Sequence, residues 1–245
     1  MNWNIMEKRI SCRSYQNQVL SQELLDKLKA FTAELNQESG LHMELIHTPE
    51  AVLKLAGAMF SGTVHTYLVL AGKDNALTAE QLGYYGEKFV LYATALGLGT
   101  CWVAGTYDKK SVRTELADGE KIHSVIPVGI PSEEIPSKQK MIRSMLRKRD
   151  RSPEAFLESE TAFADVPEWI QNGIRAVLLA PSAVNQQPVN LVYHDDRIFM
   201  KIWKNGHGMR FIDMGIAKYH FELGASLTGT QGCFQSGDNG EFIRI

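Results

Sequence analysis

Two stretches of this chain resemble each other at a constant spacing, which limits the folds that it can adopt. Residues 215–227 run parallel to residues 86–98, and a Gly-Thr pair follows each stretch, at 229–230 and 99–100. The segment that begins at Pro167 likewise resembles the one that begins at Gln22, and each opens a helix that leads to a strand. Short repeats also arise by chance, but this one predicts two related halves, the second in abbreviated form.

Hydrophobic periodicity predicts helices that alternate with short strands. The expected helices lie between Ser21 and Gly40, at 49–59, at 78–96, near 108–117, and between Pro167 and Pro181. The expected strands lie at 42–47, 66–71, 125–130 and 189–193. This alternation is typical of an α+β or α/β protein.

The composition restricts the class of protein without naming a function. With 245 residues, of which 44% are hydrophobic and 22% charged, the chain can bury the core of one large domain or of two closely joined halves. The net charge of −2 gives no electrostatic reason to expect a nucleic-acid or membrane partner. Neither an apolar leader nor an apolar run of membrane-spanning length is present.

The cysteines are odd in number, far apart and without the spacing of a metal site. They argue for reduced thiols rather than a disulfide framework, and hence for a soluble, cytoplasmic protein without a metal. They are Cys12, Cys101 and Cys233.

The loop at 180–188, with the sequence APSAVNQQP, joins a predicted helix to a predicted strand. It offers a hydroxyl and three carboxamides, which can both donate and accept hydrogen bonds. Such a loop suits a flat ring that carries alternating carbonyl and N–H groups, as an isoalloxazine does. The alternative is an ordinary helix end and turn before a strand.

The segment Arg9-Ile-Ser-Cys-Arg13 is a candidate anion site. If it is extended, the side chains of Arg9, Ser11 and Arg13 point to one side, where two guanidiniums and a hydroxyl can surround one dianion. The alternative is a basic pair on an ordinary surface. A second basic cluster either completes a phosphate pocket, or is a solvated connector or a nucleic-acid patch, the last disfavoured by the acidic remainder of the chain. Its members are Lys138, Lys140, Arg143, Arg147, Lys148, Arg149 and Arg151.

Gly97 and Gly99 invite comparison with a dinucleotide-binding fingerprint. Such a fingerprint follows a strand and opens a helix, whereas these glycines close a long predicted helix. They are better interpreted as a helix stop, after which backbone amides lie open to a ligand.

Taken together, these motifs resemble the nitroreductase family of flavin mononucleotide (FMN) enzymes, and in particular its fused group, named "putative TM nitroreductases". The resemblance rests on RxSxR at 9–13, GLGTCWVAG at 97–105, VGIP at 128–131, RxR followed by Ser-Pro at 149–153, APSAVNQQP at 180–188 and DMGIA at 213–217. In the ordinary family RxSxR and the APS loop lie in one short stretch, and paired chains hold each flavin between them. Here the APS loop occurs only in the second half, and RxSxR only in the first.

The resemblance implies an α+β fold with a mixed, mainly antiparallel sheet flanked by helices. It implies one domain over residues 1–245, made of two intertwined halves at about 1–151 and 152–245 that form an internal pseudo-dimer. Because each half keeps only part of the motif set, we expect one flavin site that is complete within a monomeric chain.

The resemblance also implies roles for individual residues. The phosphate of FMN would be held by Arg9, Ser11, Arg13, Arg149 and Arg151. The ring or ribityl chain would be approached by Pro181, Ser182, Asn185 and Gln187. Backbone amides of Val103, Ala104 and Gly105 would face the N5 and O4 edge. The implied activity is hydride transfer from NAD(P)H through FMN to a small organic acceptor such as a nitroaromatic or a quinone, with no catalytic side chain.

Two other functions remain open. A flavin-binding protein for storage or sensing would carry the same motifs, and a non-flavin interaction module would carry them by coincidence. His207 and His220 are either proton donors or ordinary surface or core residues. Trp102, Tyr107 and Trp203 are either part of a substrate wall or packing residues.

Overall fold

The computed structural model describes residues 3–49, 52–53, 59–134, 136–137, 140–141, 144–145, 151–203 and 208–245. The chain forms two compact units, each with its own sheet. Unit 1 comprises Met1–Lys8, Ala79–Lys88 and Met145–Ile245, and unit 2 comprises Arg9–Thr78 and Phe89–Ser144. The long helix α3 (Ala76–Ala95) therefore contributes residues to both units.

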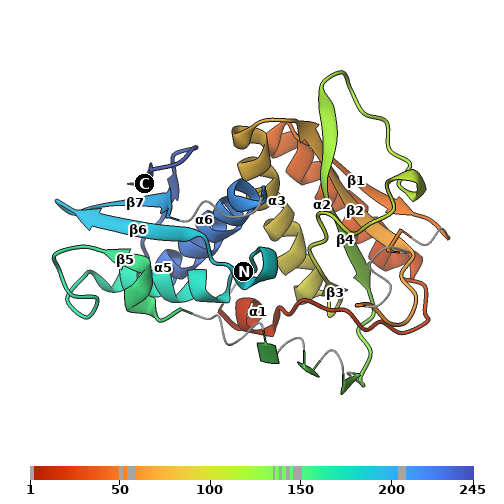
Figure 1. Cartoon of the computed structure of the whole chain (residues 1–245), viewed down its shortest axis with the longest axis horizontal. Helices are drawn as coiled ribbons and strands as arrows, with labels where there is room; N and C mark the ends of the chain where they lie inside the picture. The colour runs from red at the N-terminus through yellow and green to blue at the C-terminus, as the bar shows by residue number, and fades with distance from the viewer. Residues whose placement is uncertain are drawn as a thin grey trace. The chain divides into compact units, whose positions relative to one another are not determined.

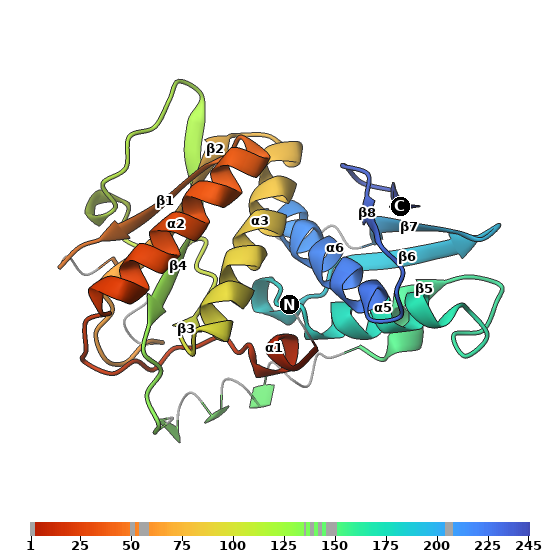
Figure 2. The ribbon, with the colours of Figure 1, turned by 180° about the vertical axis from the view of Figure 1, so that it is seen from behind.

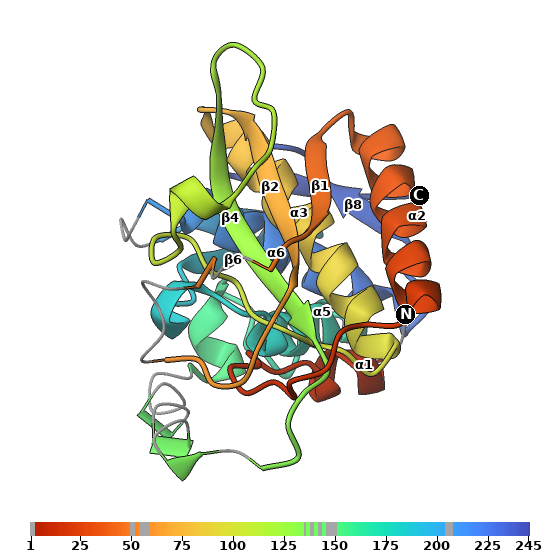
Figure 3. The same ribbon diagram turned by 90° about the vertical axis from the view of Figure 1, so that its right-hand side faces the viewer.

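Unit 2 contains a four-stranded sheet in the order β1-β2-β4-β3, in which every neighbouring pair is antiparallel. Its strands are β1 (His42–His47), β2 (Thr66–Lys73), β3 (Gly99–Thr100) and β4 (Glu120–Gly129). Helix α2 (Gln22–Ser39) and the C-terminal part of α3 lie along one face of this sheet (Figures 2 and 3). The ring of Phe31 on α2 stacks on the ring of Tyr92 on α3, with centroids 4.2 Å apart.

Local sequence explains the ends of α2 and the place of β2. The Ser21 side chain accepts a hydrogen bond from the Leu24 N–H, and Gly40 ends the helix with a φ of 68°, as these residue types predict. Strand β2 is buried at every position except Lys73. A strand buried on both faces belongs inside the sheet, which is where β2 lies.

Unit 1 contains a five-stranded sheet in the order β5-β6-β7-β9-β8. Its strands are β5 (Leu157–Glu158), β6 (Val189–His194), β7 (Arg197–Ile202), β8 (Gly232–Phe234) and β9 (Gly240–Arg244). Only the β5–β6 pair is parallel. Helices α5 (Glu168–Leu179) and α6 (Arg210–Ser226) pack together beside the β6–β7 hairpin, and the short helix α1 (Trp3–Lys8) contacts both (Figure 1).

Helix α6 crosses two other helices of unit 1 at glycines. A Cβ atom at Gly215 would lie 1.9 Å from the Glu80 carbonyl oxygen of α3, and one at Gly224 would lie 2.4 Å from the Asn172 carbonyl oxygen of α5. The crossing with α3 also buries an ion pair, in which Lys218 Nζ lies 2.6 Å from Glu80 Oε1. Any larger side chain at either glycine would push the helices apart, so the glycines set this close packing.

The two units repeat one topology. Unit 2 follows the order α2-β1-β2-α3-β3-β4, and unit 1 follows the order α5-β6-β7-α6-β8-β9. The sheet orders β1-β2-β4-β3 and β6-β7-β9-β8 correspond strand for strand, and β5 extends the second sheet. The predicted α+β class, with mainly antiparallel sheets flanked by helices, is confirmed, and the shared topology supports the repeat seen in the sequence.

The compact units do not coincide with the halves predicted from the sequence, 1–151 and 152–245. Met1–Lys8 and Ala79–Lys88 group with the C-terminal part of the chain. The division does not test whether the chain acts as one domain of intertwined halves, which stays a prediction.

Several predicted elements differ from the observed ones. The helix expected near 108–117 is only a 3₁₀ turn, η2 (Lys109–Ser111), because the backbone of Val112 is extended and its side chain is buried in the core of unit 2. Helix α1 and strands β3, β5, β7, β8 and β9 were not predicted. The helix expected at 49–59 lies largely outside the described residues, and residues 52, 53 and 59 are in turns.

Candidate functional site

The segment from Arg9 to Arg13 is extended in unit 2, as predicted. Ser11 forms an isolated parallel bridge with Thr100 of β3, and the Cys12 N–H donates to the Thr100 carbonyl oxygen at 2.8 Å. The Cys12 side chain is buried, whereas Arg9, Ser11 and Arg13 are half-buried. Ile10 is exposed, so burial does not separate two sides of the segment, and the shared direction of Arg9, Ser11 and Arg13 stays a prediction.

The three side chains converge on one neighbour, the thiol of Cys101. Ser11 donates a side-chain hydrogen bond to this thiol, and the charges of Arg13 and Arg9 act on it. All three interactions lower the pKa of Cys101, but burial raises it by more, so that the thiol stays protonated at neutral pH. Unit 2 thus gathers two guanidiniums and a hydroxyl in one place, which is the arrangement that an anion needs.

Glycine and backbone contacts hold this segment in position. The Ser61 N–H donates to the Arg13 carbonyl oxygen at 2.8 Å, and the Tyr15 N–H donates to the Ser61 carbonyl oxygen at 2.9 Å. Gly62 follows with a φ of 78°, and a Cβ atom there would lie 1.8 Å from the Tyr15 carbonyl oxygen. Only glycine tolerates both that backbone angle and that contact, so Gly62 is required for the path of the segment.

The turn at 103–105 offers fewer open amides than the sequence suggested. The Val103 N–H donates to the Val125 carbonyl oxygen at 3.0 Å, and its own carbonyl oxygen accepts from Val125 N–H and Ser124 Oγ. Val103 is therefore engaged by β4 and cannot offer its amide to a flavin without breaking this pair. Ala104 is half-buried and Gly105 is exposed, with no atom within 4 Å of a Cβ placed there. The predicted amide contacts now rest on Ala104 and Gly105.

In unit 1 the APS loop, residues 180–188, has an unusual backbone. It contains a single 3₁₀ turn, η4 (Ala183–Asn185), and follows the predicted helix α5 directly. Val184, Asn185 and Gln187 have φ angles of 46°, 54° and 46°. Left-handed conformations are disfavoured for such residues, most of all for β-branched Val184, and cost about 1–3 kcal/mol each. Strain of this kind is concentrated at ligand sites, which supports a functional role for the loop.

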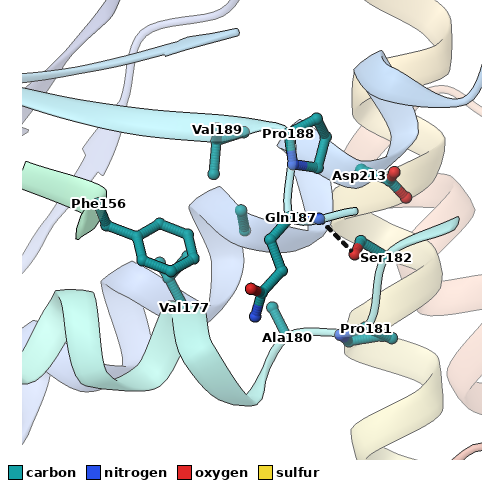
Figure 4. A pocket seen from close by; sticks show the side chains of 10 residues that line it. Phe156, Val177, Ala180, Pro181, Ser182, Gln187, Pro188, Val189 and Asp213 are labelled. Carbon is teal, nitrogen blue, oxygen red and sulfur yellow. Dashed lines mark hydrogen bonds between the residues drawn. The ribbon is translucent and has the colours of Figure 1, made fainter. Parts of the chain in front are cut away.

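Hydrogen bonds within unit 1 hold this backbone. The Gln187 N–H donates to Ser182 Oγ at 2.9 Å, drawn as a dashed line in Figure 4, and the Asn185 N–H donates to the Ser182 carbonyl oxygen at 3.0 Å. The Ala183 N–H donates to both carboxylate oxygens of Asp213, at 3.1 Å each. Ser182 and Asp213 therefore shape the loop from its two ends.

The structure gives Arg151 protein partners that the sequence did not indicate. Its Nη1 donates to the carbonyl oxygens of Gln187 at 3.1 Å and Val189 at 2.8 Å. Its Nη2 donates to the carbonyl oxygen of Ala155 and to Asn190 Oδ1. The four Nη hydrogens of a guanidinium are thereby committed to the protein, which leaves at most the Nε hydrogen for a phosphate. Arg151 fixes the APS loop to β6, and a direct phosphate contact is disfavoured.

A polar chain extends from Arg151 across the sheet of unit 1. Asn190 accepts from Arg151 and donates to Glu158 Oε1 at 2.5 Å, and Glu158 Oε2 lies 2.5 Å from Lys201 Nζ. These bonds link β5, β6 and β7 next to the base of the loop. The network supplies partners on both sides of Asn190, so that its buried carboxamide is satisfied.

The side chain of Gln187 points into the protein. Its Oε1 accepts from the Arg151 N–H at 3.1 Å, and its buried Nε2 has no hydrogen-bond partner among the described residues. This end of the carboxamide lies at a cavity of about 10 Å³, which has room for about one water molecule (Figure 4). The cavity is lined by Phe156, Val177, Ala180, Pro181, Ser182, Pro188, Val189, Asp213 and Ala217. A flavin ring does not fit there, so a ring contact by Gln187 stays a prediction.

The remaining candidate residues from the sequence lie in the core, are half-buried, or fall outside the described residues. Tyr107 is buried, its hydroxyl donates to the Ile122 carbonyl oxygen, and it packs in the core of unit 2. His220 is fully buried between the Ala176 carbonyl oxygen and Glu87, so it is a core residue. Pro181 and Asn185 are half-buried in the loop, as is Trp102 in unit 2. Arg149, His207 and most of the basic cluster lie outside the described residues, so the predictions for them are not tested.

Asp213 is the functional candidate that the sequence did not reveal. It stands in the first turn of α6, is 6% exposed, and holds the Ala183 N–H. Burial raises its pKa from the ordinary 3.8 to about 7, although the bond from Ala183 opposes the rise. A single acidic residue within an otherwise apolar helix run, DMGIA, was the available signal.

This pKa predicts how pH changes stability. The unfolded chain releases the Asp213 proton near pH 3.8, whereas the folded chain keeps it to about pH 7. The contribution of this group to the free energy of unfolding is therefore largest below pH 3.8 and falls as pH rises to about 7, by up to about 1.4 kcal/mol per pH unit. Asp213→Asn removes the titration, so we expect its urea-unfolding free energy to fall less than that of the unmodified protein between pH 4.5 and 7.

Asp165→Asn is the matched control, because Asp165 is an exposed carboxylate of the same unit. It should follow the unmodified protein across the range. Identical pH slopes for the unmodified protein and Asp213→Asn would contradict the assignment.

The described residues contain no group of three or more His, Cys, Asp or Glu side chains placed to hold a metal ion. None of the described helices combines the length and apolar character that crossing a membrane requires.

Comparisons with known proteins show which family the chain belongs to. The family model described as "Putative TM nitroreductase" matches residues 3–225. A crystal structure described as a putative nitroreductase from Thermotoga maritima MSB8 is 21% identical, with 100% of this chain and 94% of that chain covered and a TM-score of 0.67. A nitroreductase family protein from Clostridium difficile 630 is 22% identical over 59% of this chain and 92% of that one, with a TM-score of 0.43. No curated protein sequence matches significantly.

The Thermotoga maritima structure confirms the nitroreductase-like fold over the full length of the chain. Since the family model covers nearly all of the sequence as well, the chain belongs to the "Putative TM nitroreductase" family, whose name places it among the oxidoreductases.

Proposed function

We propose that this chain binds FMN and transfers hydride from NAD(P)H to a small organic acceptor such as a nitroaromatic or a quinone. The observation that carries the proposal is that Arg9, Ser11 and Arg13, in a segment bridged to β3, all act on the thiol of Cys101. Membership of a nitroreductase family supports the same function independently.

The donors of unit 2 suit a phosphate monoester. Guanidinium forks match phosphate oxygens in pairs, and a hydroxyl supplies a further donor. Hydrogen bonds to a charged group contribute about 1.5–3 kcal/mol each, so three such side chains would favour a phosphorylated ligand strongly over its neutral parent. Riboflavin and FMN differ in this one group.

The APS loop of unit 1 suits the polar edge of a ring or a ribityl chain. Ser182 and Asn185 are half-buried on a backbone that hydrogen bonds hold in a strained conformation. A side chain held in this way has little conformational freedom left to lose on binding. When bound, the flavin would supply the hydride-accepting chemistry, and these residues would orient it.

We also propose a cytoplasmic location and small molecules as the partners. The described residues include all three cysteines and contain no disulfide, which favours a reducing compartment. The net charge of −2 gives no support to a nucleic-acid partner.

The first expectation is a preference for FMN over riboflavin. Arg13→Ala should weaken FMN binding about tenfold or more, since a charge-assisted contact is lost, and should leave riboflavin binding nearly unchanged. Quenching of flavin fluorescence measures both affinities. Cys12→Ala is the matched control because it removes a buried, uncharged side chain of the same segment, and its FMN affinity should stay that of the unmodified protein. Equal affinity for FMN and riboflavin would refute the assignment of the three residues.

The second expectation separates an enzyme from a storage or sensing protein. Under anaerobic conditions NADH or NADPH should bleach the visible flavin absorbance, and a nitroaromatic or quinone should then restore it. Repeated cycles should consume nicotinamide in proportion to acceptor. A protein that binds FMN tightly but shows no bleaching with either nicotinamide supports the storage or sensing alternative.

The third expectation is one FMN per chain, with no second chain needed. The chain carries one RxSxR segment and one APS loop, so a single copy holds the full set of predicted residues. The test mixes the Arg9→Ala/Arg13→Ala protein with the Ser182→Ala/Asn185→Ala protein under conditions that allow subunit exchange. We expect that the mixture does not regain FMN binding. Restored binding in the mixture would show that the loop acts on a partner chain.

A further inference from the structure

Asp213 of unit 1 is a carboxyl group with little access to water and a single hydrogen-bond donor. Its side chain is 6% exposed. Among the described residues the one donor to it is the Ala183 N–H, which lies 3.1 Å from each carboxyl oxygen. An ionised carboxylate accepts at about four positions, so one shared N–H does not replace the water that burial removes. The closed structure therefore satisfies the neutral acid better than the ion.

The APS loop is part of what covers this carboxyl group. Asp213 lines the cavity of Figure 4, and so does Ala217, which lies one helical turn further along α6. Four residues of the loop line the same cavity, namely Pro181, Ser182, Gln187 and Pro188. The face of α6 that carries Asp213 is therefore the face that meets the loop, and opening of the loop would admit water to the carboxyl group.

The closed loop is strained, so it is a segment that can open locally. Val184, Asn185 and Gln187 have left-handed backbone angles, and hydrogen bonds to Ser182 and Asp213 hold that conformation. A strained segment held by few contacts opens before the whole protein unfolds. Any change that favours a hydrated Asp213 therefore favours the open loop first.

Among the described residues, no charged side chain acts on Asp213. Its pKa is set by burial, which raises it to about 7, and by the bond from Ala183, which opposes the rise. Lys8 and Glu168, on helices that pack against α6, are exposed. Other charged groups of α6 and of the elements packed around it have partners elsewhere: Glu80 with Lys218, Glu87 with His220, Glu222 with Tyr84, Arg175 with Gln171 and Asn172, Lys201 with Glu158, Arg197 with Glu241, and Glu7 with Trp3.

We propose that Asp213 is a pH-dependent latch of the APS loop, which keeps the loop closed while the carboxyl group is protonated and releases it when the proton passes to solvent. The neutral acid still accepts the Ala183 N–H through its carbonyl oxygen, and it carries no charge that requires water. The ion gains hydration when the loop opens, so ionisation shifts the population toward the open loop. The part of this proposal that concerns flavin binding rests on the proposed function, whereas the latch itself does not.

The direction of the pH dependence follows from the two states of the loop. With the loop closed the pKa of Asp213 is about 7, and in an open, hydrated loop it approaches the ordinary 3.8. The ratio of open to closed loop therefore rises by up to about tenfold per pH unit between these values and is constant above about pH 7. Contacts from Ser182 and Asn185 to a ligand need the closed loop, so mildly acidic pH favours binding.

The first experiment measures loop opening without any flavin. Amide hydrogen exchange, followed by NMR and corrected for the intrinsic rate at each pH, gives protection factors for the N–H groups of Ala183, Asn185 and Gln187. We expect these factors to fall between pH 5 and pH 7, by up to about tenfold per pH unit, and then to level off. They should lie about tenfold or more below those of Ile174 and Val177, buried residues of α5 that report opening of unit 1 as a whole.

Asp213→Asn tests the carboxyl group itself. The carboxamide is neutral at every pH, and its oxygen can accept the Ala183 N–H. We expect the protection factors of the loop to stay constant from pH 5 to pH 8 in this variant and to exceed those of the unmodified protein at pH 7. Asp165→Asn is the matched control, because it removes an exposed carboxylate of the same unit and should follow the unmodified protein.

The second experiment measures the effect on flavin binding. Fluorescence quenching gives the Kd of FMN for the unmodified protein and for Asp213→Asn at pH 5.5 and pH 7.5. The FMN phosphate also titrates near pH 6, but it does so for both proteins, so the ratio of the two Kd values isolates Asp213. We expect the Kd of the unmodified protein, divided by that of Asp213→Asn, to rise about threefold or more between the two pH values.

Three exchange results would overturn the latch. One is a loop whose protection factors do not change between pH 5 and pH 7 in the unmodified protein. Another is the same fall in Asp213→Asn, which assigns the titration to a different group. The third is equal protection of the loop and α5, which shows that the loop opens only when unit 1 unfolds.

The two experiments fail separately. If neither protein binds FMN but the exchange pattern appears, the proposed function fails and the latch stands. If FMN binds with a ratio of Kd values that does not change with pH, control of flavin binding by the latch is refuted.

Discussion

Hydrogen bonding by the half-buried guanidinium of Arg151 is the interaction on which the arrangement of the APS loop depends. It ties the loop at Gln187 to β6 at Val189 and Asn190, and it is itself clamped between Phe156 and Trp203. Burial lowers its pKa, because the charge loses water, while nearby Glu158 opposes the change. The planar fork accounts for the choice of residue, since a lysine ammonium cannot reach several carbonyl oxygens on two sides at once. A backbone with three left-handed residues persists only where its surroundings fix it, and Arg151 and Asp213 provide that constraint.

Unit 2 positions its candidate residues by the opposite means, through the absence of side chains. Gly62 and Gly99 let the segment from Arg9 to Tyr15 lie against neighbouring backbone and against β3. Backbone hydrogen bonds from Cys12 and Ser61 then fix its register. These hydrogen bonds use main-chain atoms alone and do not depend on the side chains of Arg9, Ser11 and Arg13. Anchoring through backbone and display through side chains is a general property of binding segments on rigid scaffolds.

Features set by local sequence could be predicted, and features set by distant partners could not. Ser21 and Gly40 mark the ends of α2 because capping depends on residues within one turn. The alternation at Arg9–Arg13 follows from the geometry of any extended strand. By contrast, nothing local shows that Val103 pairs with Val125, or that Arg151 binds carbonyl oxygens of residues 187 and 189. A basic residue near a candidate site has the same sequence signature in both roles, and only the fold decides which acceptor it meets.

The two related units differ in the length of the loop that joins their first helix to the following strand. In unit 2 the helix α2 and the strand β1 are joined by residues 40–41 alone, whereas in unit 1 the corresponding α5 and β6 are joined by residues 180–188. The shorter connection has no room for a hydroxyl and several carboxamides, and its Gly40 serves only to end the helix. The topology is otherwise the same, so the frame does not determine which unit carries which set of candidate residues. The candidate functional residues of this chain therefore lie in connections that differ between two similar frames, and a frame that tolerates such changes allows each unit to keep one part of the motif set.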